Sequence, residues 1–84
     1  MPEIEIGKVT HYYGHISVAI LQLSDLLKVG DSIHIKGHTS DFTQEITSMQ
    51  IEHKDVQEAK AGDLVGTKVG QKTHPNDKVF KVIP

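Results

Sequence analysis

Short runs with a side-chain period of two fill most of this sequence. In residues 16–20, 33–36 and 65–69, every second side chain is β-branched. That period places successive side chains on opposite faces of an extended chain, whereas a helix needs a period near 3.6. Gly, Asp, Asn and Pro residues separate the runs, as they do in turns between strands. The sequence therefore predicts an all-β fold.

Six strands account for this pattern, and helical signals are weak. Two stretches, residues 24–28 and 56–61, are each long enough for one helical turn at most, which is not stable without packing. The predicted strands cover residues 3–12, 15–22, 31–37, 42–52, 63–69 and 78–83.

Two of these strands change the parity of their apolar positions. Ile4 and Ile6 share one parity and Val9, after Gly7, takes the other; a similar change falls within residues 42–51. Such a change requires an extra residue, a β-bulge, which bends the strand. Bent strands favour a small closed barrel, because closure removes the exposed strand edges.

Three similar corners each precede an apolar run. They are Gly30-Asp31, Gly62-Asp63 and Asn76-Asp77. Glycine tolerates a positive φ, and the aspartate carboxylate can accept hydrogen bonds from nearby backbone N–H groups. We expect each corner to be a turn that starts a strand.

The length and composition exclude several classes of function. The 84 residues predict a single domain, 1–84, and the longest apolar run, Val18–Leu21, is far too short for a membrane span. There is no cysteine, hence no disulfide and no thiolate chemistry. All nine basic residues are lysines and the net charge is −2, which argues against strong nucleic-acid binding and against DNA in particular. We expect a cytoplasmic protein without a membrane partner.

Catalytic signatures are missing from the sequence. It has no P-loop, no dinucleotide-binding glycine motif and no serine-nucleophile motif. Asp63–Gly66 matches the D-x-x-G switch of GTPases, but a four-residue match without a P-loop arises by chance. We therefore predict a protein that is not an enzyme and that needs no cofactor.

The six histidines suggest a second interpretation, a site that binds a metal ion, and the spacing gives it weaker support. His11 and His15, like His34 and His38, are four residues apart. Along an extended strand this spacing separates two imidazoles by roughly 13 Å, too far for one zinc ion unless a turn shortens it. The simpler interpretation is a set of scattered surface histidines, and no metal ligand is assigned.

The segment His11–His15 contains two adjacent tyrosines, which point to opposite faces of a strand. One interpretation is that one ring closes the end of the barrel while the other is solvated. The functional interpretation is an interaction patch able to stack on a base or on a partner side chain. The candidate patch consists of Tyr12, Tyr13, His15, His53 and Lys54.

Taken in order, four strings resemble the β-barrel domain 2 of the translational GTPases, namely elongation factors Tu and G and initiation factor 2. They are Ile6-Gly7-Lys8-Val9, Leu27–Ile33, Ile46–Gln50 and Val56–Gly66 with its A-G-D-x-V-G core. The resemblance implies a closed six-stranded Greek-key-type barrel, the elongation-factor and reductase/isomerase common barrel.

The resemblance also implies a stand-alone binding module with a protein or RNA partner, such as the ribosome, tRNA or a GTPase-like chain. The sequence departs from that family: it contains no GTPase domain and no arginine, and Ser24-Asp25 replaces a usual glycine. Similar barrels form non-catalytic C-terminal modules of the U32 collagenase-like peptidases. The alternative function is therefore an accessory subunit that pairs with a peptidase-like chain.

Overall fold

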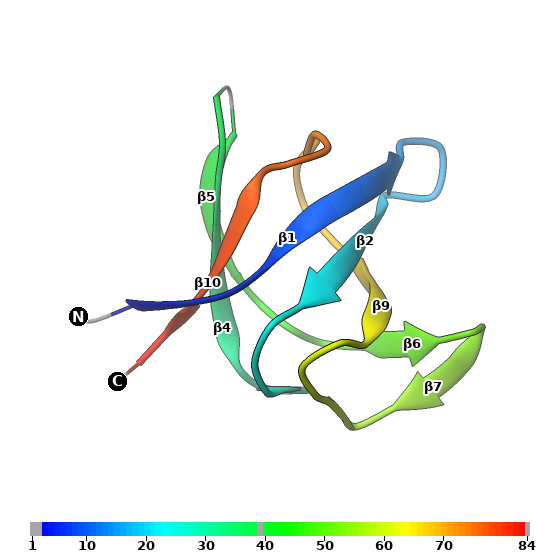
Figure 1. Cartoon of the computed structure of the whole chain (residues 1–84). Coiled ribbons are helices and arrows are strands. Elements are labelled where there is room, and N and C mark those ends of the chain that lie inside the picture. Colours follow the sequence, from blue (N-terminus) through cyan, green and yellow to red (C-terminus); the bar gives the residue numbers. More distant parts are fainter. Residues whose placement is uncertain (1–2, 39, 84) are drawn as a thin grey trace.

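The computed structural model describes residues 3–38 and 40–83, and all its regular structure is β (Figure 1). No helix forms in this part of the chain, so it contains no helix able to cross a membrane. Residues 1, 2, 39 and 84 of the predicted domain lie outside the described residues. The strands are β1 Glu3–Tyr13, β2 Val18–Leu23, β3 Leu27–Lys28, β4 Ser32–Lys36, β5 Asp41–Glu45, β6 Met49–Ile51, β7 Lys54–Val56, β8 Glu58–Ala59, β9 Leu64–Lys68 and β10 Lys78–Val82.

Eight of these strands form one antiparallel sheet in the order β5-β4-β10-β1-β2-β9-β6-β7, and β3 pairs separately with β8. The sheet curls around a single interior (Figure 1). Among the described residues, its end strands β5 and β7 do not pair with each other. The predicted closed six-stranded barrel is therefore wrong. At the two ends of the sheet, β5 pairs with β4 alone and β7 pairs with β6 alone, so in the described part of the chain each end strand keeps one edge without a strand partner.

The predicted strand 42–52 is two strands rather than one bulged strand. β5 pairs with β4, whereas β6 pairs with β9 and β7. Between them the backbone of Ile46 donates to Asp31 O and accepts from Gly30 N, both at 2.8 Å. The change of parity therefore marks a break at which the chain moves to another part of the sheet.

In β1, by contrast, the predicted bulge is confirmed. The register shifts between Glu5 and Gly7 against β10, and again between Val9 and His11 against β2. Gly7 lies where β1 approaches β2 most closely, because a Cβ at this position would collide with the carbonyl oxygen of Gln22. Glycine is therefore required by space, not by a special φ.

Neither of the two stretches with a weak helical signal forms a helical turn. Residues 27–28 and 58–59 are extended and pair with each other as β3 and β8. This pairing buries Leu27 and Ala59, and the N–H of Val29 donates to Gln57 O at 2.9 Å. A lone helical turn would make few backbone hydrogen bonds and would not place these two side chains in the same core.

The three predicted corners are confirmed as turns of one design. Asp31, Asp63 and Asp77 each accept, through Oδ2, the N–H of the residue three positions earlier, at 2.9–3.0 Å. Each also donates its own N–H back to that residue's carbonyl. The preceding residue has a positive φ in all three cases, as the third position of a type II turn requires. β4, β9 and β10 begin at the next residue.

The core is formed by the inward-facing side chains of the curled sheet. Along β4 and β9 the buried positions alternate with exposed or half-buried ones, as a sheet with one solvated face requires. Buried apolar residues are Ile6, Val9, Ala19, Leu21, Leu23, Leu27, Ile33, Ile35, Phe42, Ile46, Met49, Ala59, Val65, Val69 and Val79.

Replacing Gly7 by alanine tests the bend in β1. We expect Gly7→Ala to lower the free energy of unfolding by about 1–3 kcal/mol, because the added methyl meets backbone that cannot move aside. Gly70→Ala is the matched control: the nearest atom to a Cβ there is Gln44 Oε1 at 3.9 Å. Urea unfolding measures both variants, and equal effects would contradict the proposed constraint.

Candidate interaction groove

A groove of about 720 Å³ crosses the outer face of β2, β9 and β6. Apolar side chains dominate its walls, and most come from strands that also supply the core on their other face. Its lining residues are His11, Tyr13, Ile16, Val18, Ile20, Gln50, Ile51, Glu52, His53, Gly62, Asp63, Leu64 and Gly66. In Figure 1 these strands lie away from the side where the two termini meet.

Gly66 forms the floor of the groove. It pairs with Ile20 on one side and Gln50 on the other, in the middle of three adjacent strands. A Cβ on Gly66 would point outward and lie 3.3 Å from Ile20 Cδ1 and 3.5 Å from Val18 Cγ1. The missing side chain therefore leaves a depression between the walls.

The β1–β2 hairpin, the β6–β7 hairpin and the turn at Gly62-Asp63 surround this depression. The β1–β2 hairpin contributes Tyr13 and Ile16, and the β6–β7 hairpin contributes Glu52 and His53. Leu64, at the start of β9, is 53% exposed and Ile16 is 51% exposed. Exposed large aliphatic side chains gathered around one hollow are typical of a surface that binds another molecule.

The charge on this surface is acidic. Among the residues that line the groove, Glu52 and Asp63 are acidic and none is a lysine. Asp63 is already engaged by the N–H of Lys60, so Glu52 is the carboxylate more available to a ligand. An apolar floor with an acidic rim suits a ligand that is apolar at its centre and basic at its edge.

The structure brings together part of the patch predicted from sequence. Tyr13 and His53 both line the groove, although forty residues separate them in the chain. Tyr12 instead packs against the core and lines an adjoining hollow of about 480 Å³ with residues 72–75, and Tyr13 lines this hollow as well as the groove. His15 and Lys54 line neither, so the predicted patch is only partly assembled.

The aliphatic walls were not predicted from the sequence. Ile16, Ile20 and Leu64 were interpreted as strand residues only. A usable signal lies in residues 18–21, where both parities of a single strand are apolar. In an antiparallel sheet with one core face, a second apolar face indicates an interface.

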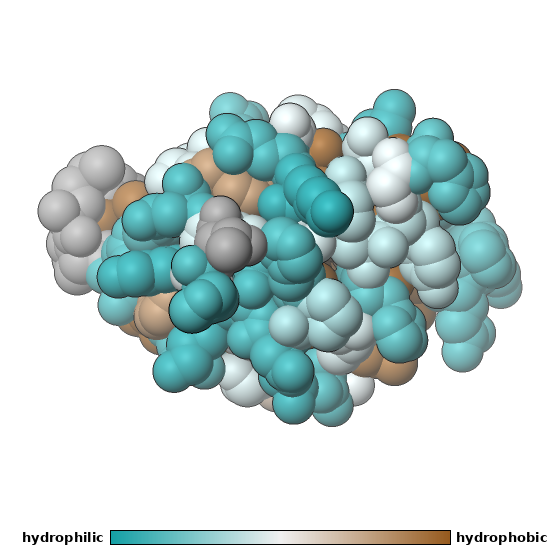
Figure 2. All heavy atoms as spheres, turned by 90° about the horizontal axis from the view of Figure 1, so that it is seen from above, coloured by the Kyte–Doolittle hydropathy of each residue, from teal (hydrophilic) through white to brown (hydrophobic). Residues whose placement is uncertain are grey.

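Figure 2 views the molecule from above, and hydrophilic side chains cover most of that end, with small, separate apolar areas. The groove is therefore a stronger candidate for an apolar contact than that end.

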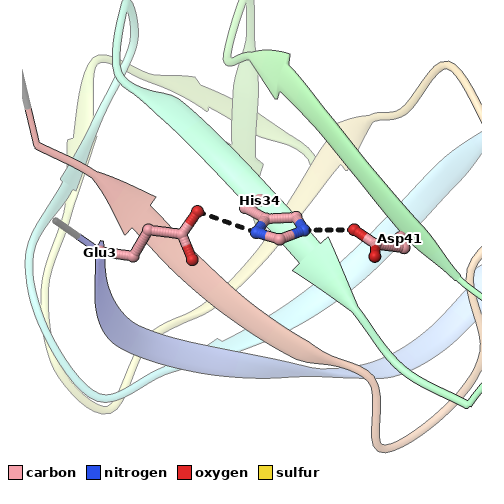
Figure 3. Close-up of polar contacts among 3 residues, drawn as sticks. All are labelled: Glu3, His34 and Asp41. Atoms are coloured by element: carbon pink, nitrogen blue, oxygen red, sulfur yellow. Dashed lines mark hydrogen bonds and ion pairs between the residues drawn. The ribbon is translucent and has the colours of Figure 1, made fainter. Parts of the chain in front are cut away.

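Apart from the groove, a cluster of three polar side chains connects the start of β1 to β4 and β5 (Figure 3). His34 Nδ1 lies 2.8 Å from Glu3 Oε2, and His34 Nε2 lies 2.5 Å from Asp41 Oδ1. The imidazole also packs at 6.2 Å from the ring of Phe80. Both ring nitrogens are occupied, so this histidine holds three strands together and has no free nitrogen for proton transfer.

The same contacts shift two pKa values. The hydrogen bond to Asp41 raises the pKa of His34 above its ordinary 6.5, and Glu3 adds to this effect, while partial desolvation opposes it. In return, the hydrogen bond from His34 lowers the pKa of Asp41 below its ordinary 3.8. Between pH 3.8 and pH 6.5, the cluster is therefore a charged pair of His34 and Asp41, with Glu3 as a second carboxylate beside the imidazole.

The histidine-based metal alternative gains no support from the geometry. Within residues 3–38 and 40–83, no three His, Asp or Glu side chains are placed to hold an ion. His11 lies beside Tyr13, with ring centroids 6.4 Å apart.

Comparison with known proteins relates the chain to peptidases. It is 44% identical over 79 residues to an uncharacterized protease of Methanocaldococcus jannaschii, covering 93% of this chain and 19% of that protein. It is 30% identical over 81 residues to a collagenase of Porphyromonas gingivalis, covering 94% and 20%. The chain therefore spans about a fifth of the length of the curated relatives it matches. No family model matches the sequence.

Solved structures show the same fold. The C-terminal domain of a Geobacillus thermoleovorans protein assigned to the U32 peptidases superposes with a TM-score of 0.89 at 23% identity, covering 95% of this chain and 93% of that one. A selenomethionine variant of that domain gives a TM-score of 0.85 at the same identity.

These findings correct the assignment to domain 2 of the translational GTPases, which is wrong. The relatives are a protease and a collagenase, and the structural neighbour is a peptidase domain. Two of the four matching strings are explained by local structure: Gly30-Asp31 and Gly62-Asp63 are type II turns that start strands. Turn chemistry of this kind recurs wherever such strands begin, so it identifies a fold more readily than a family.

The His34 cluster predicts a pH dependence of stability. Because the pKa of His34 is higher in the folded state, its contribution is complete below pH 6.5 and is lost as the pH rises through the folded value. The contribution of Asp41, whose pKa is lowered, is present above 3.8 and is lost as the pH falls through its folded value. The cluster therefore stabilises most between these limits.

Urea unfolding of His34→Gln across this range measures the effect. We expect the variant to lose less stability than the wild type between pH 6 and pH 8, while His38→Gln, a change at an exposed histidine outside the cluster, follows the wild type. An unchanged pH profile in His34→Gln would show that the cluster does not contribute.

Proposed function

We propose that this chain is a non-catalytic accessory module that packs against a peptidase-like catalytic unit. The observation that carries this proposal is the extent of the similarity: more than nine-tenths of the chain matches about a fifth of a protease and of a collagenase. In this proposal the chemistry of the larger proteins belongs to the catalytic unit and not to the matched module.

The arrangement of polar groups supports a non-catalytic role. The Glu3–His34–Asp41 cluster, in which the pKa values of His34 and Asp41 are shifted, lies on an outer surface, and both ring nitrogens of His34 already have partners. General acid–base catalysis instead needs a titrating group within reach of a substrate in a cleft. The groove contributes apolar contact and shape, which suit binding.

The expected cytoplasmic location fits this proposal. A chain without cysteine does not depend on an oxidising compartment for its stability.

Purification of the full chain from its own cells tests the proposed function. A tag at the C-terminus lies on the side away from β6 and β7 in Figure 1. We expect mass spectrometry to identify a peptidase-like chain that is enriched over a tag-only control. Its retention should be insensitive to RNase, because the groove has no lysine along its walls.

Three outcomes would contradict the proposal. The first is the absence of any peptidase-like chain among the retained proteins. The second is retention that disappears with RNase, which would indicate an RNA partner instead. Hydrolysis of peptide substrates by the purified chain alone would contradict its non-catalytic role.

A further inference from the structure

We propose that the groove over Gly66 is the surface that receives the catalytic partner, and that its occupant is a segment with an apolar side chain flanked by lysine or arginine. This inference rests on the proposed function, because it names where and by what chemistry the peptidase-like unit docks. It adds a site and a ligand class that similarity to peptidases does not supply.

Gly66 is the residue that points to a ligand. A glycine within a strand weakens the strand, since it adds backbone freedom and no packing. Unlike Gly30 and Gly62, Gly66 has no positive φ that would require it. The backbone does not crowd it, because Gln50 O lies 4.0 Å from the position of a Cβ. A Cβ would instead lie 3.3 Å from Ile20 Cδ1 and 3.5 Å from Val18 Cγ1, so a side chain could enter only if the end of Ile20 shifted. Glycine therefore keeps the floor of the groove low between these two side chains.

The walls fit one apolar anchor. Ile20 and Val18 border the floor on the β2 side, and Ile16 and Leu64 stand exposed at its margins. Aromatic contact is available from Tyr13, which is 43% exposed. Anchor residues of protein interfaces are buried in such pockets at the centre, with polar groups at the rim.

The charge of the groove determines which residues can flank the apolar anchor of the bound segment. The two ionised side chains of the groove, Glu52 and Asp63, are both acidic. A lysine or arginine next to the anchor would pair with Glu52, whereas an acidic neighbour would be repelled. A second copy of this chain is a poorer occupant, because its own groove brings the same negative charge.

Matched substitutions test the apolar part of the site. Leu64→Lys and Ile16→Lys place a charge in the groove, whereas Ile4→Lys and Leu26→Lys change exposed aliphatic side chains elsewhere. Affinity for the peptidase-like chain, measured with purified proteins, should fall at least about tenfold in the first pair. It should stay within about twofold of the wild type in the second pair.

Gly66→Val separates binding from folding. The valine fills the floor and suits a strand, but its Cβ requires Ile20 to shift, so we expect a folded variant with urea stability somewhat below that of the wild type and with binding reduced about tenfold or more. The amide NMR spectrum verifies the fold. Wild-type binding by Gly66→Val would overturn the groove as the docking site.

Charge reversal tests the chemistry of the occupant. Glu52→Lys should weaken binding several-fold at low salt, and the difference should shrink at high salt because exposed charges are screened. Glu45→Lys, on β5 and outside the groove, adds the same charge and should not weaken binding. Equal effects of the two reversals would overturn the basic flank.

The outcomes separate this inference from the proposed function. If the wild type binds no peptidase-like chain, the proposed function fails. If it binds one and the groove variants bind equally well, the module role stands and the groove assignment fails. Sedimentation that shows a dimer broken by Leu64→Lys, with no partner bound, would replace the occupant by a second copy.

Discussion

The fold depends on the bending of one strand. β1 pairs with β10 along its first part and with β2 along its second, and its register shifts once in each ladder. Between the shifts, Gly7 brings the backbone of β1 against that of β2 closely enough to exclude any side chain. Without this bend the strands on either side would diverge as a flat sheet, and Ile6 and Val9 could not both face the same interior.

Curling the sheet also determines where binding can occur. The inner faces of β2 and β9 are used by the core through Leu21 and Val65, which leaves their outer faces to solvent. On that outer side, Ile20 and Leu64 face outward around Gly66. The same two strands therefore support the core with one face and offer an apolar hollow with the other. This division fits a module whose work is contact with a larger partner.

Much of the strand pattern could be predicted from the sequence, because it follows local rules. Alternation located β4, β9 and β10, the Gly-Asp and Asn-Asp corners located their starts, and the parity change located the bend in β1. The split at Ile46 could not be predicted, since it depends on backbone bonds to Gly30 and Asp31 far along the chain. Closure failed as a prediction for the same reason, because strand order is a non-local property.

The candidate site was predicted only in part. Tyr13 and His53 were chosen for their chemistry, and both reached the groove. Gly66 and Leu64 were overlooked because an isolated glycine and an aliphatic residue in a strand fit ordinary core packing. Whether Gly66 and Leu64 belong to the core or to the groove depends on the face of the sheet that they occupy. That face is known only once β2, β9 and β6 are placed side by side.

Amide hydrogen exchange of the chain, alone and with the purified form of the proposed peptidase-like partner, tests the account most directly. We predict that protection on binding concentrates in residues 16–20, 50–53 and 62–66, which line the groove. Protection centred instead on β4, β5 and β10, with the groove amides unchanged, would contradict the account.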